Sequence, residues 1–188
     1  MKVLVLCEYS GIVSQAFRAK GHDVTSCDII PSLSSGNHHI GDALEFARSQ
    51  TADLIIAHPP CTFLCKAQFG LAARQVGRYF NQIKAAQFVR QIYSLDCPRI
   101  CVENPVGWLN NNWQSPAQIL YPYNFGDPYR KDVCLWLKGL PPLISTCVNP
   151  VRKSMSNHVN SRMSQAQKSK IKSRFFVGVA DAMAQQWS

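Results

Sequence analysis

Long hydrophobic runs are missing from this 188-residue sequence, and acidic residues are scarce. No apolar run approaches the ~20 residues that a membrane-spanning helix needs. The N-terminal apolar stretch, Val3 to Cys7, is too short to be the apolar core of a signal peptide. The chain also has no internal repeat and no low-complexity block. These absences argue against membrane, secreted and repeat proteins, so we expect a cytoplasmic protein that binds no membrane.

Acidic residues are unevenly placed as well as few. The chain carries 20 Lys and Arg residues against 11 Asp and Glu residues, which gives a formal net charge of +9. Between Val133 and Ala180 there is no acidic residue, whereas the first 132 residues are nearly balanced in charge. A basic segment attached to a nearly neutral domain favours a polyanionic partner, most often nucleic acid. A merely solvated basic face is the alternative.

Cysteine, in contrast, is abundant, with eight residues. We interpret them as reduced thiols, because no secretion signal precedes them and most lie inside apolar runs. Two pairs with CxxxC spacing, Cys61/Cys65 and Cys97/Cys101, could be taken for zinc ligands. Structural zinc sites usually begin with tighter pairs and turn residues, so we expect no metal site.

Strand patterns alternate with helical patterns along the chain. Short apolar runs predict strands at 2–7, 22–30, 53–58, 99–103 and 133–137. Helical spacing predicts helices that begin near Ser10 or Gly11, near Asp42, within 65–93 after an initial loop, and near 175. Such alternation is typical of a mostly parallel sheet covered on both faces. The predicted fold class is therefore α/β, with a Rossmann-like doubly wound sheet.

Polar residues follow several of these predicted strands. The strand at 53–58 would deliver Cys61 behind two prolines, and Glu103 ends a later strand. Open α/β sheets bind ligands at this edge, where Asp28 is well placed to accept hydrogen bonds from ribose hydroxyls. A rigidly held cysteine near a carboxylate suits covalent catalysis, in which the thiolate attacks and the carboxylate handles a proton. Taken alone, Cys61 is better explained as a buried structural thiol.

The order of these residues resembles that in the DNA cytosine-5 methyltransferases, which use S-adenosylmethionine. That family has an FSG-type motif after the first strand, an acidic residue ending the second, an aspartate in the third, PPC with the nucleophile, and ENV after the fifth. The counterparts here are Tyr9, Ser10 and Gly11; Asp28; Asp42; Pro59, Pro60 and Cys61; and Glu103, Asn104 and Pro105. Residues 125–140 and 174–187 are similar to a later motif and to the closing helix of the family.

The resemblance implies the class I S-adenosylmethionine-dependent methyltransferase fold and a covalent mechanism on cytosine. Cys61 would add to C6, Glu103 would bind the N3 and N4 edge, and Lys131 would contact the flipped base. The implied cofactor-binding residues are Tyr9, Ser10, Gly11, Asp28, Asp42 and Pro59. The implied substrate-binding residues are Pro60, Thr62, Asn104 and Arg130. The implied partner is DNA, and in a duplex the cytosine must be flipped out at a cost of a few kcal/mol.

Three positions depart from the family pattern. Val13 stands where a second glycine is usual, Thr62 where glutamine is usual, and Val133 where the second of two arginines is expected. The region between Lys138 and the closing helix is also too short for the family's target-recognition domain. We therefore expect a catalytic domain at 1–145, a basic polar insert or tail at 146–173, and a closing helix at 174–188 packed back on the sheet. Such a compact form would suit a phage or mobile-element protein.

Two alternatives remain open at this stage. The chemistry could act on a free cytosine nucleotide or on RNA cytosine, which the missing recognition domain favours and the basic tail opposes. The chain could instead be a catalytically inactive nucleic-acid-binding protein of the same fold, although retention of Cys61 and Glu103 opposes this. The PPC sequence argues against methylation of an amino group, and the oligomeric state stays open.

Overall fold

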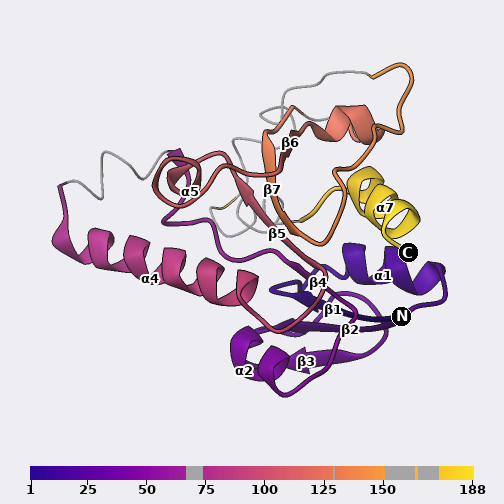
Figure 1. Cartoon of the computed structure of the whole chain (residues 1–188), viewed down its shortest axis with the longest axis horizontal. Coiled ribbons are helices and arrows are strands. Elements are labelled where there is room, and N and C mark those ends of the chain that lie inside the picture. The colour runs from indigo at the N-terminus through magenta and orange to yellow at the C-terminus, as the bar shows by residue number, and fades with distance from the viewer. Residues whose placement is uncertain (67–73, 129, 151–163, 165–173) are drawn as a thin grey trace.

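The computed structural model describes residues 1–66, 74–128, 130–150, 164 and 174–188. At its centre lies a seven-stranded sheet in the order β3-β2-β1-β4-β5-β7-β6 (Figure 1). The strands are β1 (Lys2–Leu6), β2 (Asp23–Asp28), β3 (His38–Ile40), β4 (Leu54–Ala57), β5 (Ile100–Pro105), β6 (Gln118–Leu120) and β7 (Val133–Lys138). The helices are α1 (Ile12–Ala19), α2 (Ala43–Arg48), α4 (Val76–Tyr93), α5 (Trp108–Asn112), the 3-10 helix η2 (Pro122–Phe125) and α7 (Val177–Gln186).

The strand directions confirm the predicted fold class. β1 pairs in parallel with β2 and β4, β3 with β2, and β5 with β4, whereas β7 is antiparallel to both β5 and β6. The result is a Rossmann-like doubly wound sheet that is parallel except for β7. The central strands are almost wholly apolar, as in KVLVL of β1 and LIIA of β4, because helices cover both of their faces.

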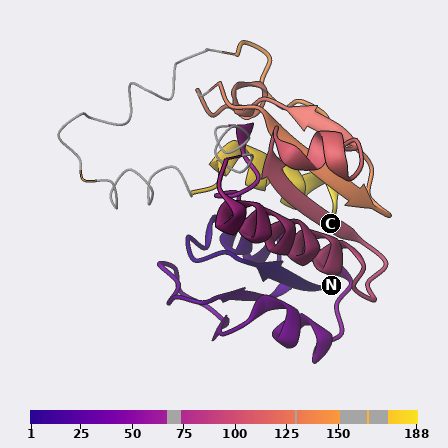
Figure 2. The same ribbon diagram turned by 90° about the vertical axis from the view of Figure 1, so that its left-hand side faces the viewer.

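Each face of the sheet has its own core. Val3 and Val5 of β1 pack on the side of α1 and α7, whereas Leu4 and Leu6 pack on the side of α2 and α4, as the alternation of side chains along a strand requires. Figure 2 shows α4 and α7 on either side of the sheet. Met183 of α7 is fully buried, and α7 lies beside α1 (Figure 1).

The sequence patterns missed three short elements, α5, β6 and η2, and ended β5 too early. α5 and β6 have five and three residues, too few for a periodic pattern to stand out. β5 continues through Asn104 to Pro105, which pairs with Val133, although proline normally argues against a strand interior. None of the described helices is both long and apolar enough to cross a membrane. Most of 146–173 lies outside the described residues, so the proposed domain division stays a prediction.

Candidate active site

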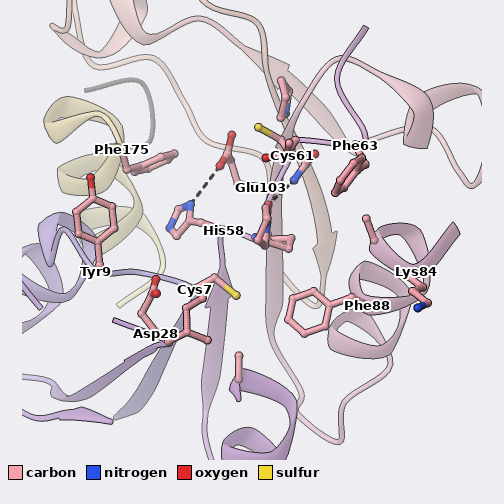
Figure 3. A pocket seen from close by; sticks show the side chains of 18 of the residues that line it. Cys7, Tyr9, Asp28, His58, Cys61, Phe63, Lys84, Phe88, Glu103 and Phe175 are labelled. Carbon is pink, nitrogen blue, oxygen red and sulfur yellow. Dashed lines mark hydrogen bonds and ion pairs between the residues drawn. The ribbon is translucent and has the colours of Figure 1, made fainter. Parts of the chain in front are cut away.

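A cavity of about 600 Å³ opens at the carboxyl ends of the parallel strands (Figure 3). Its volume lies within the range of about 300–1,000 Å³ that is usual for small-molecule sites. The strand ends contribute Asp28, His58 and Glu103, and the wall opposite them comes from α4 through Lys84 and other residues. The cavity therefore occupies the edge at which open α/β sheets bind their ligands.

Most of the residues that the sequence singled out line this cavity. Ten of the thirteen line the cavity: Tyr9, Asp28, Asp42, Pro59, Pro60, Cys61, Thr62, Glu103, Asn104 and Lys131. Ser10, Gly11 and Arg130 are absent from the described lining. The structure thus brings together the predicted set, while the role of each residue stays a prediction.

Gly11 has a backbone role next to the cavity. It precedes α1 with φ 72°, in the left-handed region that glycine adopts most readily. A β-carbon at this position would collide with the side chain of Ser34. The loop that carries Ser34 is also fixed by a hydrogen bond of 2.8 Å from the Leu33 amide to the Tyr9 carbonyl. Gly11 therefore allows this loop to pack over the start of α1.

Glu8, between the lining residues Cys7 and Tyr9, holds the start of α1, a role that sequence reasoning missed. Its buried carboxylate accepts hydrogen bonds from the Val13 amide at 2.6 Å, from the Ser14 amide at 3.2 Å and from the Ser14 hydroxyl. Helix N-termini favour an anion at this place, and here the chain provides its own. This explains the departure at Val13, whose amide binds Glu8 while its side chain is fully buried in the core. The only signal in the sequence was an acidic residue between a strand and a helix start.

The segment that carries Cys61 is tied to the end of β5. The Asn104 side-chain amide donates a hydrogen bond of 2.8 Å to the Pro59 carbonyl, and the Trp108 amide donates one of 2.7 Å to the Leu64 carbonyl. A tight turn follows the cysteine, because the Leu64 amide donates at 2.9 Å to the Cys61 carbonyl. Substrate binding by Asn104 stays a prediction, and what the structure shows is that its side chain fixes the backbone of the PPC turn.

Cys61 is exposed at the cavity wall, and its thiol is held in the protonated form. Removal of water by the surrounding protein raises its pKa, the negative charge of Glu103 raises it further, and the positive charge of Lys131 opposes them. Of these two charged neighbours, only Lys131 favours the thiolate, which is the reactive form of a cysteine. Lys131 itself lies with its Nζ 5.4 Å from the centre of the Phe176 ring. All eight cysteines are free, and the described residues contain no cluster of three or more metal-ligating side chains.

Glu103 is paired with His58, a second residue whose part sequence reasoning missed. His58 Nδ1 lies 3.2 Å from Glu103 Oε2, and the two side chains are only 12% and 11% exposed. Burial by itself would raise the pKa of Glu103, but the His58 hydrogen bond and the charge of Lys131 outweigh it and lower the pKa. Glu103 is therefore ionised at neutral pH, and His58 donates to it through Nδ1.

Two buried polar atoms, one of them on His58 itself, have no hydrogen-bond partner among the described residues. They are His58 Nε2 and Asn104 Oδ1, and both residues line the cavity. The His58 ring also lies against Phe175, with ring centres 4.5 Å apart. Buried polar groups are normally satisfied, so these atoms suit a ligand that carries complementary polar groups.

The opposite side of the cavity has the features of a nucleoside site. Asp28 ends β2 with Oδ1 accepting from the Ile30 amide at 3.2 Å, and the next side chain, Ile29, is 78% exposed on the cavity wall. Asp42 caps α2, with Oδ1 accepting at 2.9 Å from both the Leu44 and Glu45 amides, and it lines the same side. Two carboxylates beside apolar surface fit a ribose, a heterocyclic ring and a nearby positive charge.

Comparisons with known proteins found no matching family model and no matching curated sequence. Among solved structures, this chain is similar to an rRNA methylase from Escherichia coli, with a TM-score of 0.41, 15% identity, and coverage of 72% of this chain and 55% of that chain. It is also similar to the methyltransferase EhMeth of Entamoeba histolytica, with a TM-score of 0.48, 10% identity, and coverage of 88% and 62%. A third is the S. pombe Dnmt2 methyltransferase, with a TM-score of 0.46, 14% identity, and coverage of 84% and 52%. The chain thus spans between about half and three fifths of the length of these structures.

Proposed function

We propose that this protein is an S-adenosylmethionine-dependent methyltransferase that converts cytosine in nucleic acid, with DNA as the expected substrate, into 5-methylcytosine. One observation carries the proposal: Cys61 follows β4, the ionised Glu103 lies near the end of the neighbouring parallel strand β5, and both line one cavity with Lys131. This reaction needs three groups: a nucleophile, a carboxylate that binds the N3 and N4 edge of cytosine, and a cation that stabilises the developing negative charge.

The chemistry begins at C6, because C5 of cytosine is a poor nucleophile. The Cys61 thiolate forms a bond to C6, and the displaced electron pair makes C5 nucleophilic while N3 takes up a proton. Bound S-adenosylmethionine would supply an electrophilic methyl group, and C5 would bond to it as the methyl–sulfur bond breaks and the neutral thioether leaves. Loss of the C5 proton to a base then restores the double bond and expels Cys61 as thiolate, and N3 gives its proton back. Lys131 favours the thiolate at the first and last steps, because its charge lowers the pKa of Cys61.

Glu103 is suited to hold the cytosine edge. As a carboxylate it accepts a hydrogen bond from the N4 amino group. To protonate N3 it must first gain a proton, and closure of the cavity by a base favours this gain because loss of solvent raises a carboxyl pKa. The hydrogen bond from His58 to Oε2 opposes protonation of Glu103, because it stabilises the carboxylate. His58 therefore limits the conditions under which Glu103 can act as an acid.

The cofactor would lie on the side of Asp28. The Asp28 carboxylate would accept hydrogen bonds from the ribose hydroxyls, and Ile29 would contact the purine ring. The carboxylates of Asp28 and Asp42 complement the positive charge of a sulfonium ligand. The N-terminus of α1, already satisfied by Glu8, would leave the methionine carboxylate to cationic residues of the wall such as Lys131 and Arg174.

A transfer assay tests the proposal. The protein is incubated with S-adenosylmethionine labelled in the methyl group and, in parallel, with duplex DNA, single-stranded DNA, RNA and free cytidine nucleotides. We expect label in 5-methylcytosine of DNA, no transfer by Cys61→Ser, and retained transfer by the matched control Cys65→Ser. An active Cys61→Ser variant, or label on N4 or on adenine, would contradict the mechanism. Transfer only to RNA or only to free nucleotides would show that DNA is not the substrate. Cofactor binding without any transfer would favour an inactive nucleic-acid-binding protein.

A further inference from the structure

α4 has an unusual surface for a helix beside a cavity. No acidic residue occurs from 54 to 95, a stretch that includes the whole of α4 and carries five basic residues. Its inner face, with Ala86, Val89 and Ile92, is buried against the sheet. Its first turns nevertheless expose large apolar side chains: Val76 is 74% exposed, Tyr79 51% and Phe80 59%. These side chains contribute little to the core, so their exposure calls for another explanation.

Of the exposed aromatic residues, Phe80 adjoins the face of α4 that lines the cavity. Asn81, Lys84, Ala85 and Phe88 line it, at the i, i+3, i+4 and i+7 positions that share one face of a helix. Phe80 lies four residues before Lys84, which places it one turn further along the same face, beyond the last lining residue. Figure 3 shows Lys84 and Phe88 on this helix, across the cavity from His58. Helical spacing therefore places Phe80 at the edge of this lining face, one turn before Lys84.

Tyr79 supports Phe80 from the side. Their ring centres are 6.1 Å apart in an edge-to-face arrangement, which is a favourable geometry for two aromatic rings. The pair presents an exposed aromatic surface one turn from the ammonium group of Lys84. Aromatic rings beside basic side chains form the surface on which single-stranded nucleic acids bind, with bases stacked on rings and phosphates paired with cations.

We propose that Phe80 and Lys84, which we term the stacking lip, bind the nucleotide next to the target cytosine in an unpaired strand. The flanking base stacks on Phe80, and the phosphate between it and the target pairs with Lys84. This inference rests on the proposed function and deepens it, because it selects a polynucleotide with an unpaired flanking base over a free nucleotide and over an intact duplex. A free nucleotide has no flanking base to place on an aromatic surface outside the cavity.

Binding measurements test the stacking lip without any methyl transfer. A short fluorescein-labelled DNA strand with one central cytosine is titrated with the full-length protein, and anisotropy is followed over a series of salt concentrations. We expect Phe80→Ala to weaken binding about five- to a hundredfold with no change in the salt dependence, and Phe80→Trp to restore it. Lys84→Gln should weaken binding and reduce the slope of log K against log salt by about 0.7, the value for one phosphate contact on a single strand.

Matched controls separate the lip from general surface effects. Ile119, 48% exposed on β6, and Lys20, exposed at the end of α1, lie outside the cavity lining. Ile119→Ala and Lys20→Gln should bind the strand as the unaltered protein does. Because Phe80 is exposed, its replacement should also leave the circular dichroism spectrum unchanged.

Three results would overturn the inference: unchanged strand binding by Phe80→Ala, equal losses in the two control variants, or tighter binding of an intact duplex than of the single strand. The outcome is distinguishable from that of the transfer assay. Strand binding that depends on Phe80, without methylation of any cytosine, would contradict the proposed function alone. Methylation of DNA by a protein whose strand binding does not depend on Phe80 would contradict the stacking lip alone.

Discussion

Replacing His58 with phenylalanine isolates the contact that holds Glu103. Phenylalanine keeps a ring of similar size against Phe175 but removes the Nδ1 donor 3.2 Å from Glu103 Oε2. The carboxylate then stays buried, at 11% exposure, without its hydrogen bond. The charge of Lys131 alone must compensate for burial, so we expect the pKa of Glu103 to rise and the folded protein to lose stability.

The magnitude follows from the kind of bond that is lost. A hydrogen bond to a charged group contributes about 1.5–3 kcal/mol, and exposed pairs contribute less. Since both side chains are almost nine-tenths buried, we expect His58→Phe to reduce the free energy of unfolding by about 2 kcal/mol at neutral pH. For a chain of this size that equals a fall in melting temperature of about 4–8 °C.

A double-mutant cycle measures the pair itself. Urea unfolding is followed for the unaltered protein, His58→Phe, Glu103→Gln and the double variant, and the coupling energy is expected to be about 1.5–3 kcal/mol. Because the folded protein lowers the pKa of Glu103, its stabilising contribution is present above the pKa of the unfolded chain and is lost as pH falls through the folded value. The coupling should therefore shrink once the pH falls below the folded pKa of Glu103. A coupling near zero at neutral pH, or one that persists undiminished below that pKa, would refute this reasoning.

Three further predictions concern other parts of the structure. Glu8→Gln should reduce the free energy of unfolding, measured in urea, by about 2–4 kcal/mol, because three donors at the start of α1 lose their carboxylate. The control Glu45→Gln, at an exposed position, should reduce it far less, and equal reductions would contradict the role of Glu8. Lys131→Met should raise the pKa of Cys61 further and slow its alkylation by iodoacetamide at mildly alkaline pH, and faster alkylation would refute the assignment. Met183→Ala should cost about 2–5 kcal/mol in the same urea assay, since the side chain is fully buried; a loss below this range would show that α7 adds little to the core.

The sequence was sufficient for the central sheet because its signals there are strong and local. β1 and β4 are continuous apolar runs, and their periodicity and flanking turns predict buried parallel strands. β6 was missed because its three residues gain their conformation from pairing with β7, an interaction distant in the sequence. α5, with only five residues, likewise offered no periodic pattern that could be read.

The sequence predicts the site residues that lie at strand ends. It does not predict the residues whose role depends on a contact with a residue elsewhere in the fold. Cys61 and Glu103 come directly after or at the end of apolar strands, so topology alone brings them to one edge. His58 is important because it binds Glu103, 45 residues away, and Glu8 because it binds the Val13 amide, five residues away. Contacts of this kind depend on the folded geometry. Asn104 was expected to bind substrate, and its bond to Pro59 emerges only once β4 and β5 lie side by side.

A covalent trap tests the central claim most directly. In a DNA strand with 5-fluorocytosine in place of the target, fluorine replaces the C5 proton whose loss would release the enzyme, so the adduct cannot resolve after methyl transfer. The protein is incubated with this strand and S-adenosylmethionine, and the product is analysed by intact mass and peptide mapping. We predict a stable adduct that carries the methyl group and maps to Cys61. Transfer of methyl groups to unmodified cytosine with no such adduct, or an adduct that maps to Cys65 or another cysteine, would contradict the account.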